Sequence, residues 1–192
     1  MTKRVVLLGP PGSGKGTQAV GLAQALGVPA ISTGAIFRDN LARHTPLGEK
    51  AEAYMASGHL VPDEITNAMV ADRLSQPDAA NGFILDGYPR TLEQVTELDA
   101  LLQTRGIELD LAVELTLDHG RVVERLLHRA EIEGRADDTE PVIRERLAVY
   151  RKATEPIAAV YADRGKLASV DGHGAVEDVA GRLRNACLPP SD

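Results

Sequence analysis

The sequence predicts an α/β protein in which a five-stranded parallel sheet is flanked by helices, and two observations support this fold class. The first is a set of five short apolar runs bounded by Gly, Pro or Asp, which cover residues 5–9, 29–33, 82–86, 111–117 and 167–170. Because these runs are continuously apolar, each is typical of a strand that is covered on both faces. The second is the helical spacing of apolar residues between the runs, since strands that alternate with helices indicate a parallel sheet.

The expected helices follow the strands in chain order. Apolar residues spaced at i, i+3, i+4 and i+7 form one stripe over residues 19–26, and Gly27 ends this helix. Pro156 is expected to bend the helix over residues 141–164. Between residues 33 and 82 the chain carries about three helical segments and no strand, so we expect a small helical subdomain beside the sheet. The remaining helices are expected over residues 91–104, 121–130, 141–164 and 175–186.

Composition excludes several classes of protein. The 192 residues suit one domain, and 43% hydrophobic with 26% charged residues argues against disorder. The 21 Lys and Arg against 28 Asp and Glu give a net charge of −7, which argues against a general nucleic-acid binder. No apolar stretch approaches the ~20 residues of a membrane span, and the run at 5–8 is too short for a signal peptide. We therefore expect a cytoplasmic protein without membrane or nucleic-acid partners, and a monomer.

The single cysteine, Cys187, excludes an intramolecular disulfide and a Cys-based zinc site. A buried or tail thiol is expected rather than a nucleophile.

A glycine-rich segment at residues 9–17, GPPGSGKGT, follows the first expected strand and opens directly into a helix. Glycines permit positive φ and turn backbone N–H groups inward as an anion nest, and the helix N-terminus adds partial positive charge. Lys15 supplies a full charge to the β- and γ-phosphates, although here Gly16 stands between Lys15 and Thr17. A glycine-rich turn between strand and helix is one alternative. A dinucleotide-binding fingerprint is another, but G-x-G-x-x-G is not present in order and that fingerprint does not explain Lys15. The segment therefore predicts a nucleotide phosphate loop.

Charged residues elsewhere fit this prediction. Asp86 ends an apolar strand, where phosphate-loop proteins place a carboxylate near magnesium, although a turn cap is the alternative. Arg90 follows at the carboxyl edge of the sheet, where its planar guanidinium could hold a second phosphate.

Further arginines gather around the polar segment at residues 131–139. Arg125 and Arg129 share one helix face, Arg135 lies in the segment and Arg146 follows it. Their convergence indicates anions between them, whereas a solvated face paired with nearby glutamates is the alternative.

Taken together, these segments resemble the adenylate kinases, which are nucleoside monophosphate kinases. The resemblance covers nearly the whole chain. Its further elements are Ser32-Thr33-Gly34 with Arg38, GHLVPDE at 58–64, DGYPR at 86–90 with Gln94 (Tyr replacing the usual Phe), GRADD at 134–138 with Arg146, and VDG at 170–172.

The resemblance implies one phosphate-loop (P-loop NTPase-type) kinase domain over residues 1–192, with a helical monophosphate-binding insertion at 32–61 and a short lid at 128–138. Long-lid relatives carry an extra β domain there, sometimes with a Cys-rich zinc site. This chain lacks both the length and the cysteines, so no zinc is expected. For Asp137 and Asp138 we favour pairing with lid arginines over a metal site.

The implied reaction is reversible phosphoryl transfer from MgATP to AMP, giving two ADP, for adenine nucleotide homeostasis and AMP salvage. The implied catalytic residues are Lys15, Arg90, Arg129, Arg135 and Arg146. Those implied to bind ATP are Gly12, Ser13, Gly14, Lys15, Gly16, Thr17, Arg125, Arg129 and Gly174. Those implied to bind AMP are Thr33, Arg38, His59, Leu60, Val61, Gly87, Tyr88, Pro89, Arg90, Gln94, Arg135 and Arg146. Thr17, and Asp86 through water, are implied to hold Mg²⁺.

Three alternatives stay open at this point. A UMP/CMP kinase would share the fold, and only Thr33 and Gln94 bear on the choice of base. A GTP-binding switch protein would need N-K-x-D after a strand, but the strand at 111–117 is followed by DHGR. A nicotinamide oxidoreductase conflicts with the glycine spacing described above.

Overall fold

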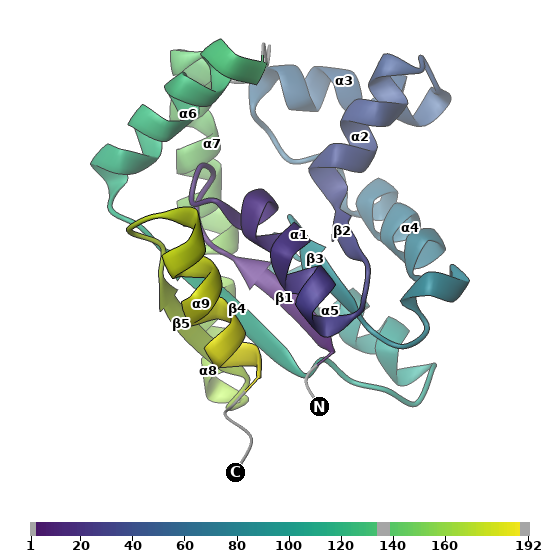
Figure 1. Cartoon of the computed structure of the whole chain (residues 1–192). Helices are drawn as coiled ribbons and strands as arrows, with labels where there is room; N and C mark the ends of the chain where they lie inside the picture. The colour runs from purple at the N-terminus through teal and green to yellow at the C-terminus, as the bar shows by residue number, and fades with distance from the viewer. Residues whose placement is uncertain (1–2, 134–138, 189–192) are drawn as a thin grey trace.

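The computed structural model describes residues 3–133 and 139–188, and it confirms the predicted sheet (Figure 1). All pairings are parallel and the strand order is β2-β3-β1-β4-β5. The carboxyl ends of the strands therefore meet at one edge, which collects Leu8, Asp86 and the residues after Thr116 and Asp171. The strands are β1 (Arg4–Leu8), β2 (Ala30–Ser32), β3 (Phe83–Asp86), β4 (Leu111–Thr116) and β5 (Leu167–Asp171).

Helices α2, α3 and α5 each begin after a short polar side chain that caps them. Ser32, Thr45 and Thr91 each accept a hydrogen bond from a backbone N–H of the helix that they precede, which satisfies one otherwise unpaired donor. The α-helices are α1 (Lys15–Leu26), α2 (Thr33–Ala42), α3 (Pro46–Ser57), α4 (Asp63–Leu74), α5 (Leu92–Gln103), α6 (His119–Glu133), α7 (Glu140–Val149), α8 (Pro156–Asp163) and α9 (Val176–Cys187). The three helices expected between residues 33 and 82 are α2, α3 and α4, and a 3₁₀ turn (Pro77–Ala79) follows them.

The expected single helix over 141–164 is divided into three parts. A π-helical segment, η2 (Tyr150–Thr154), separates α7 from α8, and the Glu155 N–H bonds to the Tyr150 carbonyl five residues back. Proline has no N–H to donate and its ring crowds the preceding turn. The irregularity therefore lies one turn before Pro156 rather than at it.

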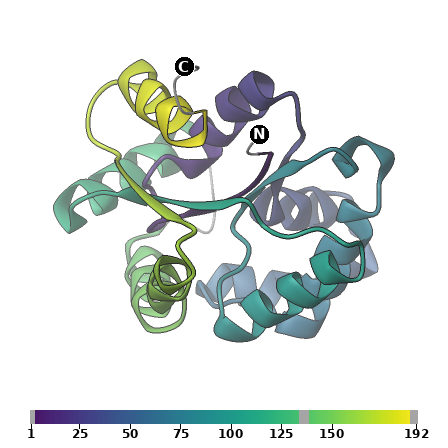
Figure 2. The ribbon, with the colours of Figure 1, turned by 90° about the horizontal axis from the view of Figure 1, so that it is seen from below.

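Helices cover both faces of the sheet, as Figure 2 shows from the end. On one face α1 and α9 pack against Val5, Leu7, Ile84 and Val113, and the Cys187 thiol is buried there, as predicted. On the other face α4, α5 and α8 pack against the alternate side chains of the same strands. In the described part of the chain no helix is long and apolar enough to cross a membrane.

The base of α6 lies directly on the phosphate loop. A side-chain carbon at Gly12 would stand 2.9 Å from the Leu126 side chain and 3.1 Å from the Val122 carbonyl oxygen. Val122 and Leu126 are themselves buried against Ile143 and Leu147 of α7. This packing brings the arginine-bearing helices to the same edge as the loop.

Gly58 and His59, which directly follow α3, lie against α7. A side-chain carbon at Gly58 would lie 3.0 Å from the Val142 carbonyl oxygen and 3.1 Å from Arg146 Cγ, and Gly58 has φ +79°. His59 Nε2 is 3.4 Å from Glu145 Oε1. The helical subdomain thus reaches the helix that carries Arg146.

His173 bridges the end of β5 and the start of α6. Its Nδ1 lies 2.6 Å from Asp171 Oδ1 and its Nε2 lies 2.8 Å from Asp118 Oδ2. Hydrogen bonds to Asp118 and Asp171 raise the pKa of His173. The imidazole lowers the pKa of Asp118, and the His173 backbone N–H and then the imidazole lower the pKa of Asp171.

Replacing His173 with Asn should therefore lower stability in a pH-dependent way. A histidine whose pKa is raised on folding stabilises the protein fully below its unfolded pKa of about 6.5, and this contribution is lost as pH rises through the folded value. We expect the difference in thermal midpoint between wild type and His173→Asn to be largest near pH 6 and to shrink as the pH rises above it. A difference in thermal midpoint that stays constant or grows with pH would contradict stabilisation by the contacts of His173 with Asp118 and Asp171.

Candidate active site

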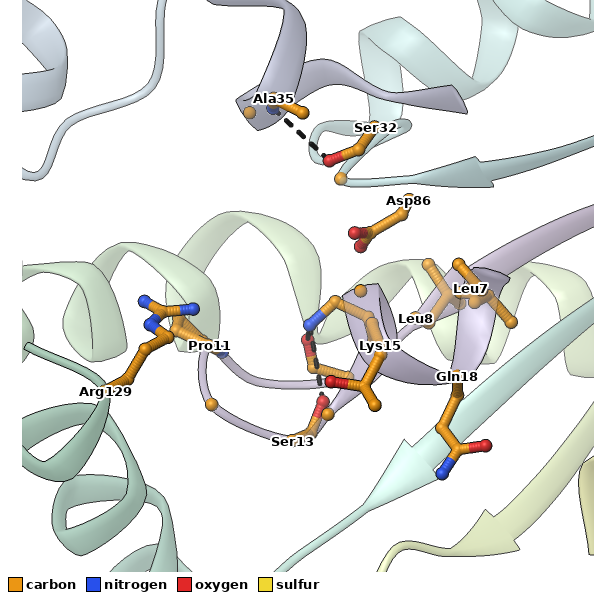
Figure 3. Close-up of a pocket in the computed structure, with 18 of the residues that line it drawn as sticks. Leu7, Leu8, Pro11, Ser13, Lys15, Gln18, Ser32, Ala35, Asp86 and Arg129 are labelled. Carbon is orange, nitrogen blue, oxygen red and sulfur yellow. Dashed lines mark hydrogen bonds between the residues drawn. The ribbon is translucent and has the colours of Figure 1, made fainter. Parts of the chain in front are cut away.

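A cavity of about 1000 Å³ opens at the carboxyl edge of the sheet. It is lined by the phosphate loop, the start of α2, the segment after β3, and α6 and α7. Figure 3 shows Lys15, Asp86 and Arg129 around this space, each from a different element. A second cavity, of about 80 Å³, adjoins it, and Arg38, Arg90 and Arg146 line both.

The phosphate loop is folded by three glycines in the left-handed region, Gly9, Gly12 and Gly14, with φ of +135°, +81° and +96°. The last of them caps α1, so the helix begins at Lys15. Backbone N–H groups at this terminus, together with the helix dipole, form a site for an anion.

The Lys15 ammonium group is turned onto its own loop. Its Nζ donates to the carbonyl oxygens of Gly9 at 2.7 Å and Pro10 at 2.9 Å, and to Ser13 Oγ at 3.3 Å. Burial lowers the pKa of Lys15 to about 8; the Asp86 carboxylate opposes this shift, and Arg90, Arg146 and Arg129 add to it. The charged form of Lys15 is therefore disfavoured beside the cavity.

Arg90 is held against the segment that follows β3. Its Nε donates to the Gly87 carbonyl at 2.9 Å, and its own carbonyl accepts a hydrogen bond from Thr154 Oγ1 at 2.9 Å. Burial lowers the pKa of Arg90, with Arg146 and Arg38 acting in the same direction and Asp86 opposing them.

Gly87 has to be glycine for this arrangement. Its φ is +83°, and a side-chain carbon there would lie 2.7 Å from Thr33 Oγ1 and 2.9 Å from Arg90 Nη2. Any larger residue would displace the guanidinium.

Asp86 and Thr17 both line the large cavity and carry oxygen atoms. Asp86 Oδ2 would be 3.5 Å from a side-chain carbon at Gly16, so the missing side chain leaves room in front of the carboxylate. Thr17 is exposed and lines the cavity. Carboxylate and hydroxyl oxygens next to a phosphate site are donors that suit Mg²⁺.

One end of the large cavity is closed by the loop after β5. Arg125 Nη2 donates to the Gly172 carbonyl at 3.4 Å, and Gln18 Nε2 donates to the Val176 carbonyl at 2.9 Å. Gly174, with φ +107°, lines the cavity beside them. These contacts make a wall of backbone and Arg125 that could face a flat base.

The smaller cavity lies between α2, the end of α3 and the start of α5. Thr33 Oγ1 donates to the Gly87 carbonyl at 2.9 Å, and the Gln94 side chain, only 2% exposed, reaches the cavity wall. Arg38 lies over its own helix start, with Nη1 3.2 Å from where a side-chain carbon of Gly34 would be.

The structure brings nearly all of the expected site residues to these two cavities. The large cavity is lined by Gly12, Ser13, Gly14, Lys15, Gly16, Thr17, Arg38, Leu60, Asp86, Gly87, Pro89, Arg90, Arg125, Arg129, Arg146 and Gly174. The small cavity adds Thr33, His59, Val61 and Gln94.

Two expected residues stand apart from these lists. The Tyr88 side chain lines neither cavity: it is 2% exposed in the core and its hydroxyl donates to Asn67 Oδ1 at 2.7 Å. Tyr88 therefore belongs to the core and not to the cavity wall. Arg135, like Asp137 and Asp138, lies outside the described residues.

Sequence reasoning missed three residues that shape the site. Asp63 accepts a hydrogen bond from the Gln94 side chain, and Thr154 donates one to the Arg90 carbonyl. Tyr150 lines the large cavity. Asp63 belongs to the GHLVPDE segment, but its partner is 31 positions away. No local pattern predicts that contact.

The arrangement suits two nucleosides joined through phosphates. Each cavity has polar groups able to face a base. Arg38, Arg90 and Arg146 line both cavities, and Lys15 and Arg129 line the large one. Such a row of cations could hold phosphates that arrive from both sides.

Comparison with known proteins agrees with this geometry. Residues 7–166 match the family model described as "Adenylate kinase". The adenylate kinase of Kocuria rhizophila is 53% identical over 183 residues, which cover 95% of this chain and 97% of that protein. The adenylate kinases of Micrococcus luteus and Thermobifida fusca are 55% and 53% identical over 183 residues, or 95% of this chain and 89% and 97% of theirs. These matches confirm the family that the sequence motifs predicted. The chain belongs to the adenylate kinase family.

Proposed function

We propose that this adenylate kinase binds MgATP in the large cavity and AMP in the small one, and transfers the γ-phosphoryl group between them to give two ADP. The observation that carries this assignment is that Arg38, Arg90 and Arg146 line both cavities. Cations shared by two adjoining sites can neutralise a phosphate chain that spans both.

The donor nucleotide is held by the phosphate loop. Backbone N–H groups over residues 12–17 surround the β- and γ-phosphates, and Lys15 exchanges its carbonyl partners for phosphate oxygens. Arg125 and Gly174 lie against the adenine of ATP.

The acceptor nucleotide is held by Arg38 and Arg90 at its phosphate and by Thr33 and Gln94 at its base. The remaining cavity wall comes from His59, Leu60, Val61, Gly87 and Pro89. Guanidinium groups suit this task because their planar donors match two phosphate oxygens at once.

Transfer itself requires positioning and positive charge rather than a general base. The attacking AMP phosphate is already an oxyanion, and the transferring group passes through a loose transition state with charge on its equatorial oxygens. Arg129 and Arg146 stabilise that charge, and we assign the same role to Arg135.

The oxygen atoms of Thr17, and of Asp86 through water, would hold Mg²⁺. The ion would supply positive charge close to the phosphates of ATP. Asp86 also attracts Lys15 and Arg90, so it orders the cations as well as the metal.

Water has to be excluded, because it would compete with AMP as the acceptor. We assign this to closure of the insertion at 32–61 and the lid at 128–138 over the cavities. The close approach of Gly58 to Val142 and Arg146 of α7 supports this assignment. The monomeric state and the cytoplasmic location remain predictions.

The test of the proposed function is ADP formation from MgATP with AMP, CMP, UMP or GMP as acceptor. We expect strong preference for AMP, with two ADP formed for each AMP consumed. Turnover with UMP or CMP instead would overturn the assignment of the base. ATP binding without turnover on any acceptor would overturn the reaction.

Replacing Arg90 with Ala should lower kcat by about 100-fold or more, because Arg90 positions the attacking AMP phosphate and a misplacement of about 1 Å can have an effect of that size. The matched control is Arg144→Ala, because Arg144 is exposed on α7 and pairs with Glu140. Circular dichroism should show both variants folded. Wild-type turnover in the Arg90 variant would remove its assigned role.

A further inference from the structure

The Gln94 amide is held in one orientation by two groups of opposite character. Its Nε2 donates to Asp63 Oδ1 at 2.6 Å, and its Oε1 accepts from the Arg90 backbone N–H at 2.7 Å. A carboxylate only accepts and a backbone N–H only donates. Rotating the amide by 180° would place oxygen against oxygen and N–H against N–H, so both partners select the same orientation.

Asp63 is itself fixed for this task. Thr91 Oγ1 donates to Asp63 Oδ2 at 2.7 Å, and the same Oγ1 accepts from the Gln94 N–H at 3.1 Å to cap α5. Asp63 is the first residue of α4, where the helix dipole favours a negative charge. The carboxylate thus joins the first turns of α4 and α5 at the wall of the small cavity.

After these contacts the amide keeps one N–H and one oxygen lone pair for a ligand. A 6-aminopurine offers the complementary pair on its Watson–Crick edge, an N1 acceptor beside an amino donor. A 6-oxopurine offers the reverse pattern, an N1–H donor beside an oxygen acceptor. An amide that could rotate would match either base.

We propose that Asp63 is a positioning residue for specificity: by locking the Gln94 amide, it makes the acceptor site select 6-aminopurine over 6-oxopurine monophosphates. This rests on the proposed function, which places the acceptor base against Gln94. Asp63 does not touch the substrate and acts through Gln94.

The test is the ratio of kcat/KM for AMP to kcat/KM for IMP in wild type and Asp63→Asn, from rates of ADP formation at saturating MgATP. Asparagine can donate or accept, so it no longer selects an amide orientation and leaves only the Arg90 N–H to do so. We expect the ratio to fall about tenfold or more, within the range for losing a bidentate base contact. KM for AMP should rise more than kcat falls, and KM for ATP should stay unchanged.

Glu64→Gln is the matched control, because it removes one negative charge at the next, exposed position of the same helix. It should keep the wild-type ratio. The ratio is independent of the fraction of enzyme that is folded, so loss of stability in Asp63→Asn does not obscure the result.

An unchanged ratio in Asp63→Asn, with both acceptors affected equally, would overturn the role of Asp63 and leave the proposed function intact. A wild-type enzyme that does not prefer AMP over IMP would instead overturn the assignment of the acceptor base. The two failures are therefore distinguishable.

Discussion

The whole site depends on the crowding of positive charges at the carboxyl edge of the sheet. Lys15 and Arg90 are drawn out of water there, and neighbouring arginines further disfavour their charged forms. Asp86 offsets part of this repulsion, and the carbonyl groups of the loop hold Lys15 in place. Such a cluster is stable only because the rest of the fold supports it, and an incoming polyphosphate is the ligand that relieves it.

The fold supplies this support from several directions. The parallel sheet brings the phosphate loop and Asp86 to one edge, and β1 and β3 are neighbours in register there, with Leu7 opposite Asp86. The base of α6 packs on Gly12, while the end of α3 packs on α7 through Gly58. The first contact joins α6 to the phosphate loop, and the second joins α7 to the segment after α3. Hydrogen bonds from Gln94 to Asp63 and from the Arg90 N–H to Gln94 fix the side chains at the small cavity in the same way.

The features that were predictable from sequence are those encoded locally. The apolar runs gave the strands, the glycine pattern with Lys15 gave the phosphate loop, and the family followed from several such segments together. Contacts between distant segments left no local pattern: the Asp63–Gln94 bond, the Thr154–Arg90 bond and the burial of Tyr88 each depend on helix packing. The π-helical segment before Pro156 was missed because a proline predicts a disturbance but not its place. The roles assigned to individual residues, and the bounds of the insertion and lid, remain predictions.

The most direct test of this account is an NMR titration of the Lys15 side chain in the ligand-free protein and with ATP bound. We predict a midpoint near pH 8 without ligand, because burial and the nearby arginines disfavour the ammonium form. Phosphates favour that form, so ATP should raise the midpoint and its binding should take up a proton above pH 8. A ligand-free midpoint near the ordinary 10.5, or one that ATP does not raise, would contradict the account.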